Sequence, residues 1–420
     1  MLGSIRSSLG SLSLVVLVPL AVQAQDRAPA LPDGAGRSQV ESLCTGCHQT
    51  NMITASAGYT REGWAELAST MIDLSSVPED RAAILQYLAT HFPPNTRRAA
   101  KLVPGPLQIS FKEWQTPKLG QRSRDPVQAA DGLIWWAGQW GNVIGSIDPK
   151  TGAMTEYPLP ANAMPHTVEI DRHGHVWYTG NKNATVGYLD PKTGRVTEYK
   201  MPDPAATDPH TLIFDRKGIA WFTLQNSNMV GRLDPATGAI RLVTMKTPNA
   251  KPYGIKEDAS GNLWIACNGA PCLAKVDPAT MELTEVKLPT PGTTVRRLDI
   301  AEDGIIWFVN SGQGKLGRYD PKSGEIKEWP SPSGPKSHPY AILVLDGAVW
   351  YNESGVRPDA LVRFDPKTQT FQSWAIPSGG IHAGIIRHMR ATRDGQSLLI
   401  HQSSTNRIIQ VNVQRRAASR

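Results

Sequence analysis

The chain of 420 residues is poor in cysteine, with four, and in charge, with 19% charged residues. It has no run of Lys or Arg longer than two, which argues against nucleic acid as a partner despite a net charge of +7. After residue 24 no apolar stretch approaches the length that spans a bilayer, so we expect no membrane span in the mature chain. Glycine (37) and proline (33) are plentiful, and they indicate many tight turns and a β-rich body.

Residues 1–24 have the pattern of a secretory signal peptide. Arg6 precedes an apolar run from Leu12 to Val22, and small residues stand three and one before the expected break after Ala24. The run is too short to cross a bilayer, although an uncleaved anchor is the alternative. We therefore expect export, to the periplasm if the source is bacterial, and a soluble mature protein.

Two of the cysteines lie in the motif Cys44-Thr45-Gly46-Cys47-His48. Thiols at this spacing can add to the two vinyl groups of one haem, and the imidazole that follows can take an axial position on the iron. The two cysteines alone would also suit a redox dithiol or half a zinc site. The histidine and the export signal favour one covalent haem c, attached at Cys44 and Cys47, with His48 as an iron ligand.

Three short helices are expected in residues 35–95, at about 38–47, 61–74 and 78–92. Trp64, Leu67 and Met71 recur at spacings of three and four, so they would share one helix face. We predict Met71 as the second iron ligand, because a thioether is a common partner of histidine on a haem iron. Met52 and His91 are the alternatives, and Met71 could also be ordinary core packing.

This segment resembles the small class I cytochrome c domains. The resemblance rests on C-T-G-C-H, on G-W-x-x-L-x-x-x-M around Trp64, and on I-L-x-Y-L-A-x-x-F-P-P from Ile84 to Pro94. It implies a one-haem domain that transfers electrons.

Beyond Pro104 the sequence repeats with a period of about 43 residues. Six units have a Gly followed by Trp and then a turn of the type Asp-Pro-x-Thr/Ser, which Gly closes in four of them. The tryptophans are Trp135, Trp177, Trp221, Trp264, Trp307 and Trp350. A seventh unit, Asp394-Gly395…Leu398, lacks the Trp. Four short strands per unit indicate a seven-bladed β-propeller over residues 105–412, with strand 109–117 closing the last blade. The fold class is therefore an α plus all-β two-domain chain, a three-helix cytochrome c domain followed by a propeller.

The repeats resemble the streptogramin B lyase (virginiamycin B lyase) family, in stretches such as Trp221-Phe222-Thr223 and Pro252-Tyr253-Gly254-Ile255. That resemblance implies a lyase that uses Mg²⁺ held by glutamates and a histidine base. The residues at the corresponding repeat positions argue against simple transfer, because Glu353 is retained but Tyr340 replaces the base and Arg296 the neighbouring histidine. We therefore expect no Mg²⁺-dependent lyase. The series just after the inner-strand proline is Val127, His166, His210, Tyr253, Arg296, Tyr340 and Arg387.

We expect these inner-strand residues, with Arg297 and His388, to line a funnel that favours an anionic or carbonyl-bearing ligand. Pairing with local carboxylates is the alternative, and a copper or zinc cluster that includes His401 is a further one. Cys267 and Cys272 flank a turn between adjacent strands and suit a disulfide better than a thiolate metal site.

The leading hypothesis is an extracytoplasmic electron-transfer protein, in which the propeller binds a redox partner protein or a small anionic substrate. Candidate catalytic residues in the propeller are His166, His210, Tyr340, Arg296, Arg387 and Glu353. The alternatives are a haem-tethered lyase or hydrolase, and a non-enzymatic binding module whose cytochrome only localises it.

Overall fold

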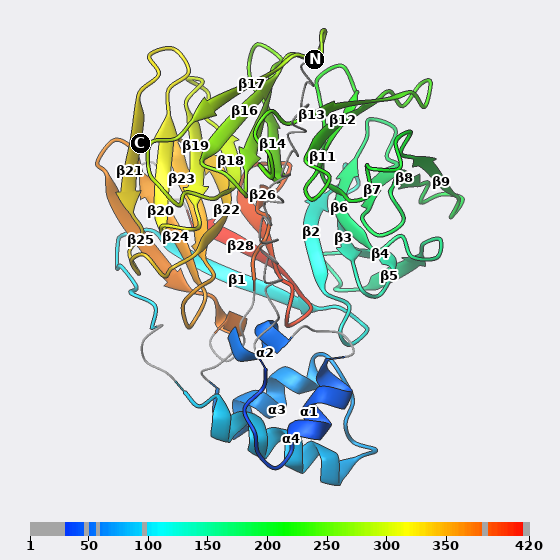
Figure 1. The fold of residues 1–420 in the computed structure, drawn as a ribbon, viewed down its shortest axis with the longest axis vertical. Coiled ribbons are helices and arrows are strands. Elements are labelled where there is room, and N and C mark those ends of the chain that lie inside the picture. Colours follow the sequence, from blue (N-terminus) through cyan, green and yellow to red (C-terminus); the bar gives the residue numbers. More distant parts are fainter. Residues whose placement is uncertain (1–29, 46–49, 56–58, 95–98, 380–384, 415–420) are drawn as a thin grey trace, which may run out of the picture.

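A computed structural model describes residues 30–45, 50–55, 59–94, 99–379 and 385–414. The expected signal peptide lies outside these ranges, and so do Cys47 and His48 of the predicted haem motif. The described chain forms a ring of β-sheets with a small helical domain on one of its faces (Figure 1). None of the described helices is both long and apolar enough to cross a membrane.

The three expected helices are present as α1 (Arg37–Cys44), α3 (Arg61–Ser69) and α4 (Pro78–His91), and a further short helix, α2 (Thr50–Ala55), follows the first. Thr60 caps α3 by accepting a bond from the Gly63 amide at 3.1 Å. The helices enclose one core of buried residues: Leu31, Val40, Ile53, Tyr59, Trp64, Leu67, Leu74, Ile84, Leu85, Tyr87, Leu88 and Phe92.

Helix α3 ends earlier than predicted. The Thr70 hydroxyl donates to the Leu67 carbonyl at 2.8 Å, and the helix stops at Ser69 instead of continuing to Leu74. This bond competes with the backbone ladder, as threonine side chains commonly do. Met71 therefore lies just after the helix rather than on its face, although it still packs against the helical core.

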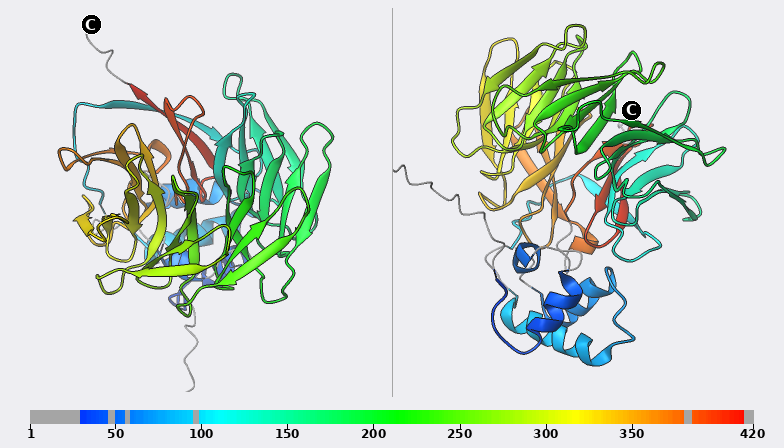
Figure 2. Two further views of the ribbon diagram at one scale, coloured as in Figure 1. Left: turned by 90° about the horizontal axis from the view of Figure 1, so that it is seen from above. Right: turned by 45° about the vertical axis from the view of Figure 1, so that its right-hand side comes forward.

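Seven antiparallel sheets of four strands, the blades, follow one another around the ring (Figure 2). Blades 1–6 each use four consecutive strands, and the first strands of neighbouring blades contact one another. Blade by blade the strands are β2 (Ser123–Gln128), β3 (Ile134–Gly138), β4 (Val143–Ile147), β5 (Met154–Pro158); β6 (Pro165–Ile170), β7 (Val176–Gly180), β8 (Thr185–Leu189), β9 (Val196–Lys200); β10 (Pro209–Phe214), β11 (Ala220–Leu224), β12 (Met229–Leu233), β13 (Ile240–Thr244); β14 (Pro252–Glu257), β15 (Leu263–Cys267), β16 (Cys272–Val276), β17 (Leu283–Lys287); β18 (Val295–Ile300), β19 (Ile306–Asn310), β20 (Lys315–Tyr319), β21 (Ile326–Pro330); β22 (Pro339–Leu345), β23 (Ala348–Glu353), β24 (Ala360–Asp365) and β25 (Thr370–Ala375).

The seventh blade closes the ring with strands from both ends of the propeller. It contains β26 (Arg390–Ala391), β27 (Ser397–Gln402), β28 (Arg407–Gln414) and, outermost, β1 (Gln108–Gln115). Strand β1 pairs along its whole length with β28, from Gln108 with Gln414 to Gln115 with Arg407. The predicted closing strand is thus confirmed, displaced by one residue at its start and two at its end.

The repeated tryptophans hold neighbouring blades together. The indole nitrogen of Trp221 donates to Asp215 at 2.9 Å, and its ring packs in one cluster with Ile255, Leu263 and Ile265 of the next blade. Trp177 and Trp264 make the same bond to Asp171 and Asp258. Blades 2, 3 and 4 thus each supply both a turn carboxylate and the indole that the carboxylate orients.

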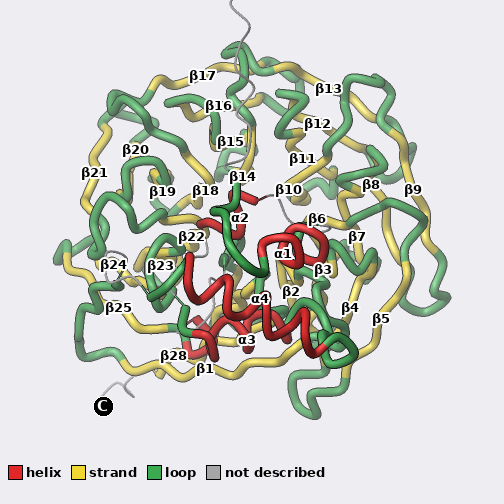
Figure 3. Tube along the Cα trace, turned by 60° about the horizontal axis from the view of Figure 1, so that its bottom comes forward, coloured by secondary structure: helices red, strands yellow, loops and turns green. Residues whose placement is uncertain are grey.

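The helical domain lies against one face of the ring (Figure 3), the face at which the inner strands begin. The Thr70 carbonyl accepts bonds from the Gly120 amide at 2.9 Å and from the Asn406 side chain at 2.6 Å. Its hydroxyl lies 3.2 Å from the Ser404 carbonyl. The residues that connect the two domains also run along the propeller, where Val103 and Ser373 exchange two hydrogen bonds of 2.8 Å.

Candidate functional site

The inner strands of blades 1–6 begin with the same irregular step. Near the start of each the ladder to the second strand shifts register, for example between Pro165 and Val168 in blade 2. In blades 1–6 the second residue of the inner strand, such as His166 after Pro165, occupies an equivalent position. In blade 7 we add Arg387, which precedes β26. We call these seven residues the axial cluster: Arg124, His166, His210, Tyr253, Arg296, Tyr340 and Arg387.

The first-blade member differs from the prediction. Val127 pairs with Trp135, which places it three residues beyond the equivalent position. Arg124 is the true counterpart of His166, and it is only 2% exposed. Counting back eleven residues from the motif tryptophan reaches His166 in blade 2 and Arg124 in blade 1, so the tryptophan spacing contained the signal.

The aromatic members of the axial cluster contact one another around the ring. The imidazole centroids of His166 and His210 are 3.5 Å apart, and the His210 ring lies 4.1 Å from that of Tyr253. The hydroxyls of Tyr253 and Tyr340 share a hydrogen bond. These tyrosines belong to blades 4 and 6, so their side chains meet across the inner end of blade 5.

Arg296, from blade 5, lies above both tyrosines. Its guanidinium carbon is 4.8 Å from the Tyr340 ring centroid and 5.6 Å from that of Tyr253. These distances are within the range of a cation–π interaction, which strengthens where water is excluded. The structure thus brings together four of the predicted funnel residues: His210, Tyr253, Arg296 and Tyr340.

The next residue, Arg297, crosses to three other blades. Its Nε donates to the Arg387 carbonyl of blade 7, and its Nη1 lies 3.5 Å from the Thr211 hydroxyl of blade 3. Its Nη2 lies 3.7 Å from the Asp125 carboxylate of blade 1. Arg297 therefore links blade 5 to blades 1, 3 and 7 at this level of the ring.

Asp125 is a site residue that the sequence analysis missed. Its side chain is fully buried, and its carboxylate accepts a bond from the Thr167 hydroxyl at 2.8 Å and lies 3.6 Å from His388 Nδ1. Burial acts to raise the pKa of Asp125, but the positive charges of Arg297 and Arg124 outweigh it, so the pKa is lowered and the carboxylate is ionised.

Positive charge exceeds negative charge at this site. Among the described residues, Asp125 is the one carboxylate within ion-pair distance of Arg124, Arg296, Arg297 or Arg387. Several of their nitrogens have no hydrogen-bond partner in the part of the chain that the structure describes: Arg124 Nε and Nη2, Arg296 Nε, Arg297 Nη2 and Arg387 Nη1. Leaving buried charged donors unpaired is costly, so the arrangement favours an anion as a further partner.

The tyrosine pair is affected by these charges. Burial would raise the pKa of Tyr340, but Arg296, Arg387 and Arg124 lower it to about 7. The pKa of Tyr253 is raised to about 12, first by burial and then by negative charge on Tyr340. The pair can therefore lose one proton near neutral pH, which leaves Tyr340 as a phenolate that accepts a bond from Tyr253.

The histidines at the site are neutral. Burial, followed by nearby arginines, holds the pKa values of His166, His210 and His388 well below the ordinary range. Burial likewise lowers the pKa of His401 to about 3, although Asp125 opposes it. The described residues contain no group of three or more His, Cys, Asp and Glu side chains that could hold a metal ion, so the histidine metal cluster is not found there.

Glu353 is bound within its own blade. Its carboxylate accepts bonds from the Ser331 hydroxyl at 2.7 Å, the Ser333 amide at 3.0 Å and the Ser333 hydroxyl. It pairs in the ladder with Pro339, one residue before Tyr340, and it is fully buried. Glu353 therefore lies beside the start of the strand that carries Tyr340, but its carboxylate oxygens are already hydrogen-bonded to Ser331 and Ser333.

Met71 faces the axial cluster through a small cavity. The cavity has a volume of about 20 Å³, enough for one water molecule, and is lined by Met71, Gly120, Arg122, Trp140, Arg387, Ser403, Ser404 and Asn406. Gly120 has φ +66°, and a Cβ there would lie 2.9 Å from the Met71 carbonyl oxygen, so this close approach requires glycine. Arg387 thus belongs both to the axial cluster and to the contact with the helical domain.

The described part of the predicted haem motif lies at the end of α1. Cys44 is the last residue of that helix, is half-buried, and packs against the same core as Met71. Met52 lies in α2, and its side chain is outside the described residues. His91 packs against Tyr87, with ring centroids 4.5 Å apart.

The predicted disulfide between Cys267 and Cys272 is confirmed, with Cα atoms 5.4 Å apart. It joins the end of β15 to the start of β16 in blade 4. Both cysteines are buried in the cluster between blades 3 and 4. The bond therefore staples a hairpin and leaves no thiolate for a metal at this position.

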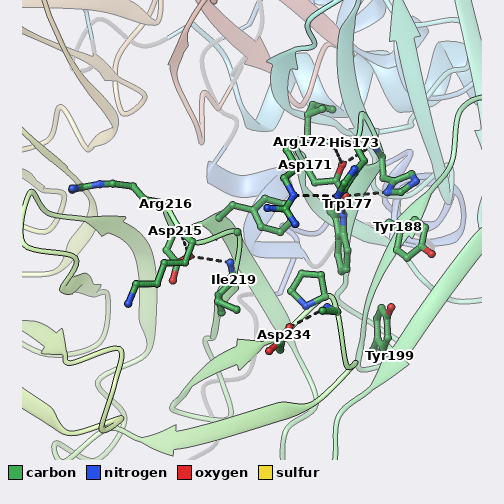
Figure 4. A pocket seen from close by; sticks show the side chains of 17 residues that line it. Asp171, Arg172, His173, Trp177, Tyr188, Tyr199, Asp215, Arg216, Ile219 and Asp234 are labelled. Atoms are coloured by element: carbon green, nitrogen blue, oxygen red, sulfur yellow. Dashed lines mark hydrogen bonds and ion pairs between the residues drawn. The ribbon is translucent and has the colours of Figure 1, made fainter.

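A groove of about 420 Å³ lies between blades 2 and 3, away from the axial cluster (Figure 4). Trp177, Tyr188 and Phe214 supply its aromatic lining, and Arg172 and Arg216 its positive charge. Asp171 binds His175 at 3.0 Å and the Trp177 indole at 2.8 Å, so its carboxylate is already engaged in holding the blade together. The sequence analysis did not identify this groove, because its lining comes from two repeats.

The comparisons with known proteins agree with the repeat architecture. Residues 107–276 match the Virginiamycin B lyase family. The virginiamycin B lyase of Staphylococcus aureus has a similar structure, with a TM-score of 0.65 and 25% identity over 73% of this chain and 99% of that one. A catalytically inactive histidine-to-alanine variant of that enzyme, solved with quinupristin, matches with the same values.

A more distant similarity shows the fold alone. The hydrazine synthase structure from Kuenenia stuttgartiensis has a TM-score of 0.56 at 13% identity, over 71% of this chain and 97% of that one. No curated protein matches the chain. Residues 108–414 of this chain form a virginiamycin B lyase-like seven-bladed β-propeller.

Proposed function

We propose that this protein is an extracytoplasmic electron-transfer protein, whose propeller binds a small anionic substrate at the axial cluster and whose helical domain carries one haem c. The observation that carries the proposal is the excess of buried, unpaired arginine donors on the propeller face that the helical domain covers. Guanidinium groups in such a setting recognise carboxylate and phosphate oxygens.

The residues of the helical domain suit a covalent haem in their chemistry. Cys44 and Met71 lie against one apolar core, and an apolar surround is what a haem requires. Cys44 and Cys47 would attach the group, and His48 and Met71 would hold its iron, which would supply one-electron chemistry.

The contact between the domains supports electron exchange over a short distance. Thr70, next to Met71, is bonded to Asn406 and Gly120 of the propeller, and Arg387 lines the cavity beside Met71. An anionic substrate held by Arg296 and Arg387 would therefore lie near the residues that adjoin the iron. The arginines bind and orient it, and the packed ring of side chains excludes bulk water.

The first test is haem ligation. The purified full-length chain should carry one covalent haem, and Met71→Ala should abolish the near-infrared band of methionine ligation and lower the reduction potential. Met201→Ala, in the loop after β9 of the propeller, is the matched control and should change neither. A chain without covalent haem, or a Met71→Ala variant with an unchanged spectrum and potential, would contradict the ligand assignment.

The second test is substrate-dependent reduction of the haem. In a screen of anionic reductants, Arg296→Gln should weaken the reduction at least tenfold, since hydrogen bonds to charged groups contribute about 1.5–3 kcal/mol. Arg241→Gln, on the exposed outer strand of blade 3, should leave it unchanged. Reduction by a small chemical reductant should be equal in all three proteins. Equal substrate-dependent rates in the two arginine variants would refute the proposed binding site.

A lyase remains the second candidate function because one observation favours it. Tyr340 stands where the resemblance places the base, and its pKa of about 7 would let its phenolate accept a proton from a substrate near neutral pH. Ring opening of a streptogramin-like ester by a Cys44→Ala/Cys47→Ala chain would establish it, and Tyr340→Phe should then abolish turnover. In that case haem reduction would play no part in the reaction.

A further inference from the structure

We propose that the axial cluster is a binding site for an oxyanion, a carboxylate or phosphate group of a ligand. Without a ligand, the negative charge of the Tyr340 oxygen balances the arginines. When the ligand binds, its negative charge takes over this role, and the Tyr340 oxygen takes up one proton. The proposal deepens the proposed function, on which it rests for the position of the ligand.

The donors for such a group come from three blades. Arg124 (blade 1) is 2% exposed and Arg387 (blade 7) 7% exposed, and each has at least one nitrogen without a partner among the described residues. Arg296 (blade 5) adds its Nε. All three lower the pKa of Tyr340, so their charges act on one point. Arg124 keeps one bond, from its Nη1 to the Gln139 side-chain oxygen at 2.7 Å, and Arg296 lies over the Tyr340 ring. Buried guanidinium groups with free nitrogens suit an oxyanion better than a chance surface patch does.

The tyrosine pair offers the counter-charge. Its two hydroxyls are hydrogen-bonded, and the Arg296 guanidinium lies over both rings at 4.8 and 5.6 Å. When the pair loses one proton, the Tyr340 oxygen carries a negative charge that partly neutralises the arginines. The cluster can therefore remain buried without a ligand, at the expense of a phenol proton.

The groups that face Tyr340 are known from each element packed on it. Arg296 comes from β18, Arg387 from the segment before β26, and Arg124 from β2. Arg122, just before β2, also interacts with Tyr340: burial lowers the pKa of Arg122, and negative charge on Tyr340 opposes that shift. Tyr253 comes from β14, with the neutral His210 of β10 on its other side.

Just before β22, the His338 ring lies 5.9 Å from that of Tyr340. Burial, and then Arg296 and Arg387, lower the pKa of His338 to about 4, so it is neutral at the pH where Tyr340 titrates. Tyr340 is therefore the group in this set that changes charge near pH 7.

A second anion in this buried space would repel the phenolate strongly. The favoured outcome is transfer of one proton from solvent to the Tyr340 oxygen, because nearby like charges raise the pKa of an acidic group. The restored hydroxyl can then donate a hydrogen bond to the ligand. No electron moves, and the net change is one anion bound and one proton taken up.

This exchange fixes the pH dependence of binding. Below the pKa of Tyr340, about 7, the hydroxyl is already protonated and affinity is constant. Above it, each bound anion must bring a proton, so affinity falls about tenfold per pH unit. Simple attraction between benzoate and arginines would show no such slope, because benzoate does not titrate in this range; for phosphate, which does, the slope is assigned by comparison with Tyr340→Phe.

Calorimetry on the oxidised full-length protein tests the proposal, with benzoate and inorganic phosphate as probes. Titrations at about pH 9, in buffers of different protonation enthalpy, should give close to one proton taken up per anion bound. Tyr340→Phe should still bind the probe, with no proton uptake and no slope with pH. Arg296→Gln should bind at least tenfold more weakly, and Arg241→Gln should behave as the unaltered protein. The probe that binds more tightly identifies the ligand's oxyanion as a carboxylate or a phosphate.

Three results would overturn the proposal: neither probe binds, binding occurs without proton uptake, or Tyr340→Phe retains the uptake. The experiment is independent of electron transfer, because it needs no reduction of haem. Proton-linked binding with no substrate that reduces the haem would leave this proposal standing and contradict the proposed function. Substrate-dependent haem reduction without proton uptake on binding would do the reverse.

Discussion

Replacing Asp125 by Asn should destabilise the propeller strongly, because it removes the negative charge that faces the buried arginines of the axial cluster. The Asp125 side chain is fully buried, 3.7 Å from Arg297 Nη2 and 2.8 Å from the Thr167 hydroxyl. Asn keeps the volume and can still bond to Thr167, so the change removes mainly the charge. Breaking a buried ion pair typically costs about 3–5 kcal/mol, because the remaining charge is left uncompensated.

The loss should be measurable by thermal unfolding at neutral pH. At about 2 °C per kcal/mol for a domain of this size, the expected decrease in Tm is about 6–10 °C. Asp131→Asn, in the exposed turn of the same blade, keeps its bond to the Leu133 amide and should stay within about 0.5 kcal/mol of the unaltered protein.

The pH dependence follows from the lowered pKa of Asp125. A carboxyl group with a lower pKa in the folded state stabilises the protein fully above its unfolded pKa, near about 3.9, and loses that contribution as the pH falls through the folded value. The difference in Tm between the unaltered protein and Asp125→Asn should therefore shrink on acidification below about pH 4. A variant that melts like the unaltered protein at neutral pH would show that the carboxylate does not stabilise the arginines.

Three further predictions concern the closing strand of the ring and the disulfide of blade 4. Trp114→Ala in β1 should cost about 3–5 kcal/mol in the free energy of unfolding, because its buried indole packs between blades 1 and 7, whereas the half-exposed Trp329→Ala should cost less. Deleting residues 109–117 should cause aggregation, since the ladder to β28 is lost, and a monomeric deletion variant with unchanged Tm would contradict ring closure by β1. Replacing Cys267 and Cys272 together by Ala should cost about 2 kcal/mol, the loop entropy of a short disulfide, and an equal Tm without reductant would contradict this.

The blades could be predicted because their signals are local and repeated. A turn of the type Asp-Pro-x-Thr-Gly acts within five residues, and the Trp that follows each Gly recurs every 42–44 residues. Such signals determine the number and order of the strands. The last unit has no outer strand of its own, so the spare strand at the start of the propeller is expected to supply it. The bond from Trp221 to Asp215 shows how short the decisive interactions are.

The chemistry of the site could be predicted only in part, because it depends on contacts between distant repeats. The sequence identified Arg296, Tyr340 and Arg387 as neighbours, but not the bond between the Tyr253 and Tyr340 hydroxyls, which are 87 residues apart. Asp125 escaped notice because the proline of blade 1, Pro126, stands three residues later in the inner strand than Pro165 does in blade 2, and so pointed to Val127. Met71 was assigned to a helix because spacing cannot show that the Thr70 hydroxyl competes for the Leu67 carbonyl.

The attachment of the helical domain rests on Asn406, and this gives the last prediction. Its side-chain amide donates to the Thr70 carbonyl at 2.6 Å, and its side-chain oxygen accepts from the Arg122 amide at 2.7 Å. Asn406→Asp keeps the acceptor and tolerates the φ of +53°, but it turns a carboxylate oxygen toward a carbonyl. The contact between the domains should weaken by about 1–3 kcal/mol, the cost of an unsatisfied buried group.

Hydrogen exchange at the Gly120 amide, which donates to the same Thr70 carbonyl, measures this contact. Its rate should rise about tenfold to a hundredfold if exchange proceeds by local separation of the domains. Asn228→Asp is the matched control, because Asn228 has φ +59° and donates to the Thr247 carbonyl in the same way within blade 3. The control should lower propeller stability locally and leave exchange at Gly120 unchanged. If both variants accelerate that exchange equally, the effect comes from the propeller as a whole, and Asn406 does not hold the helical domain in place.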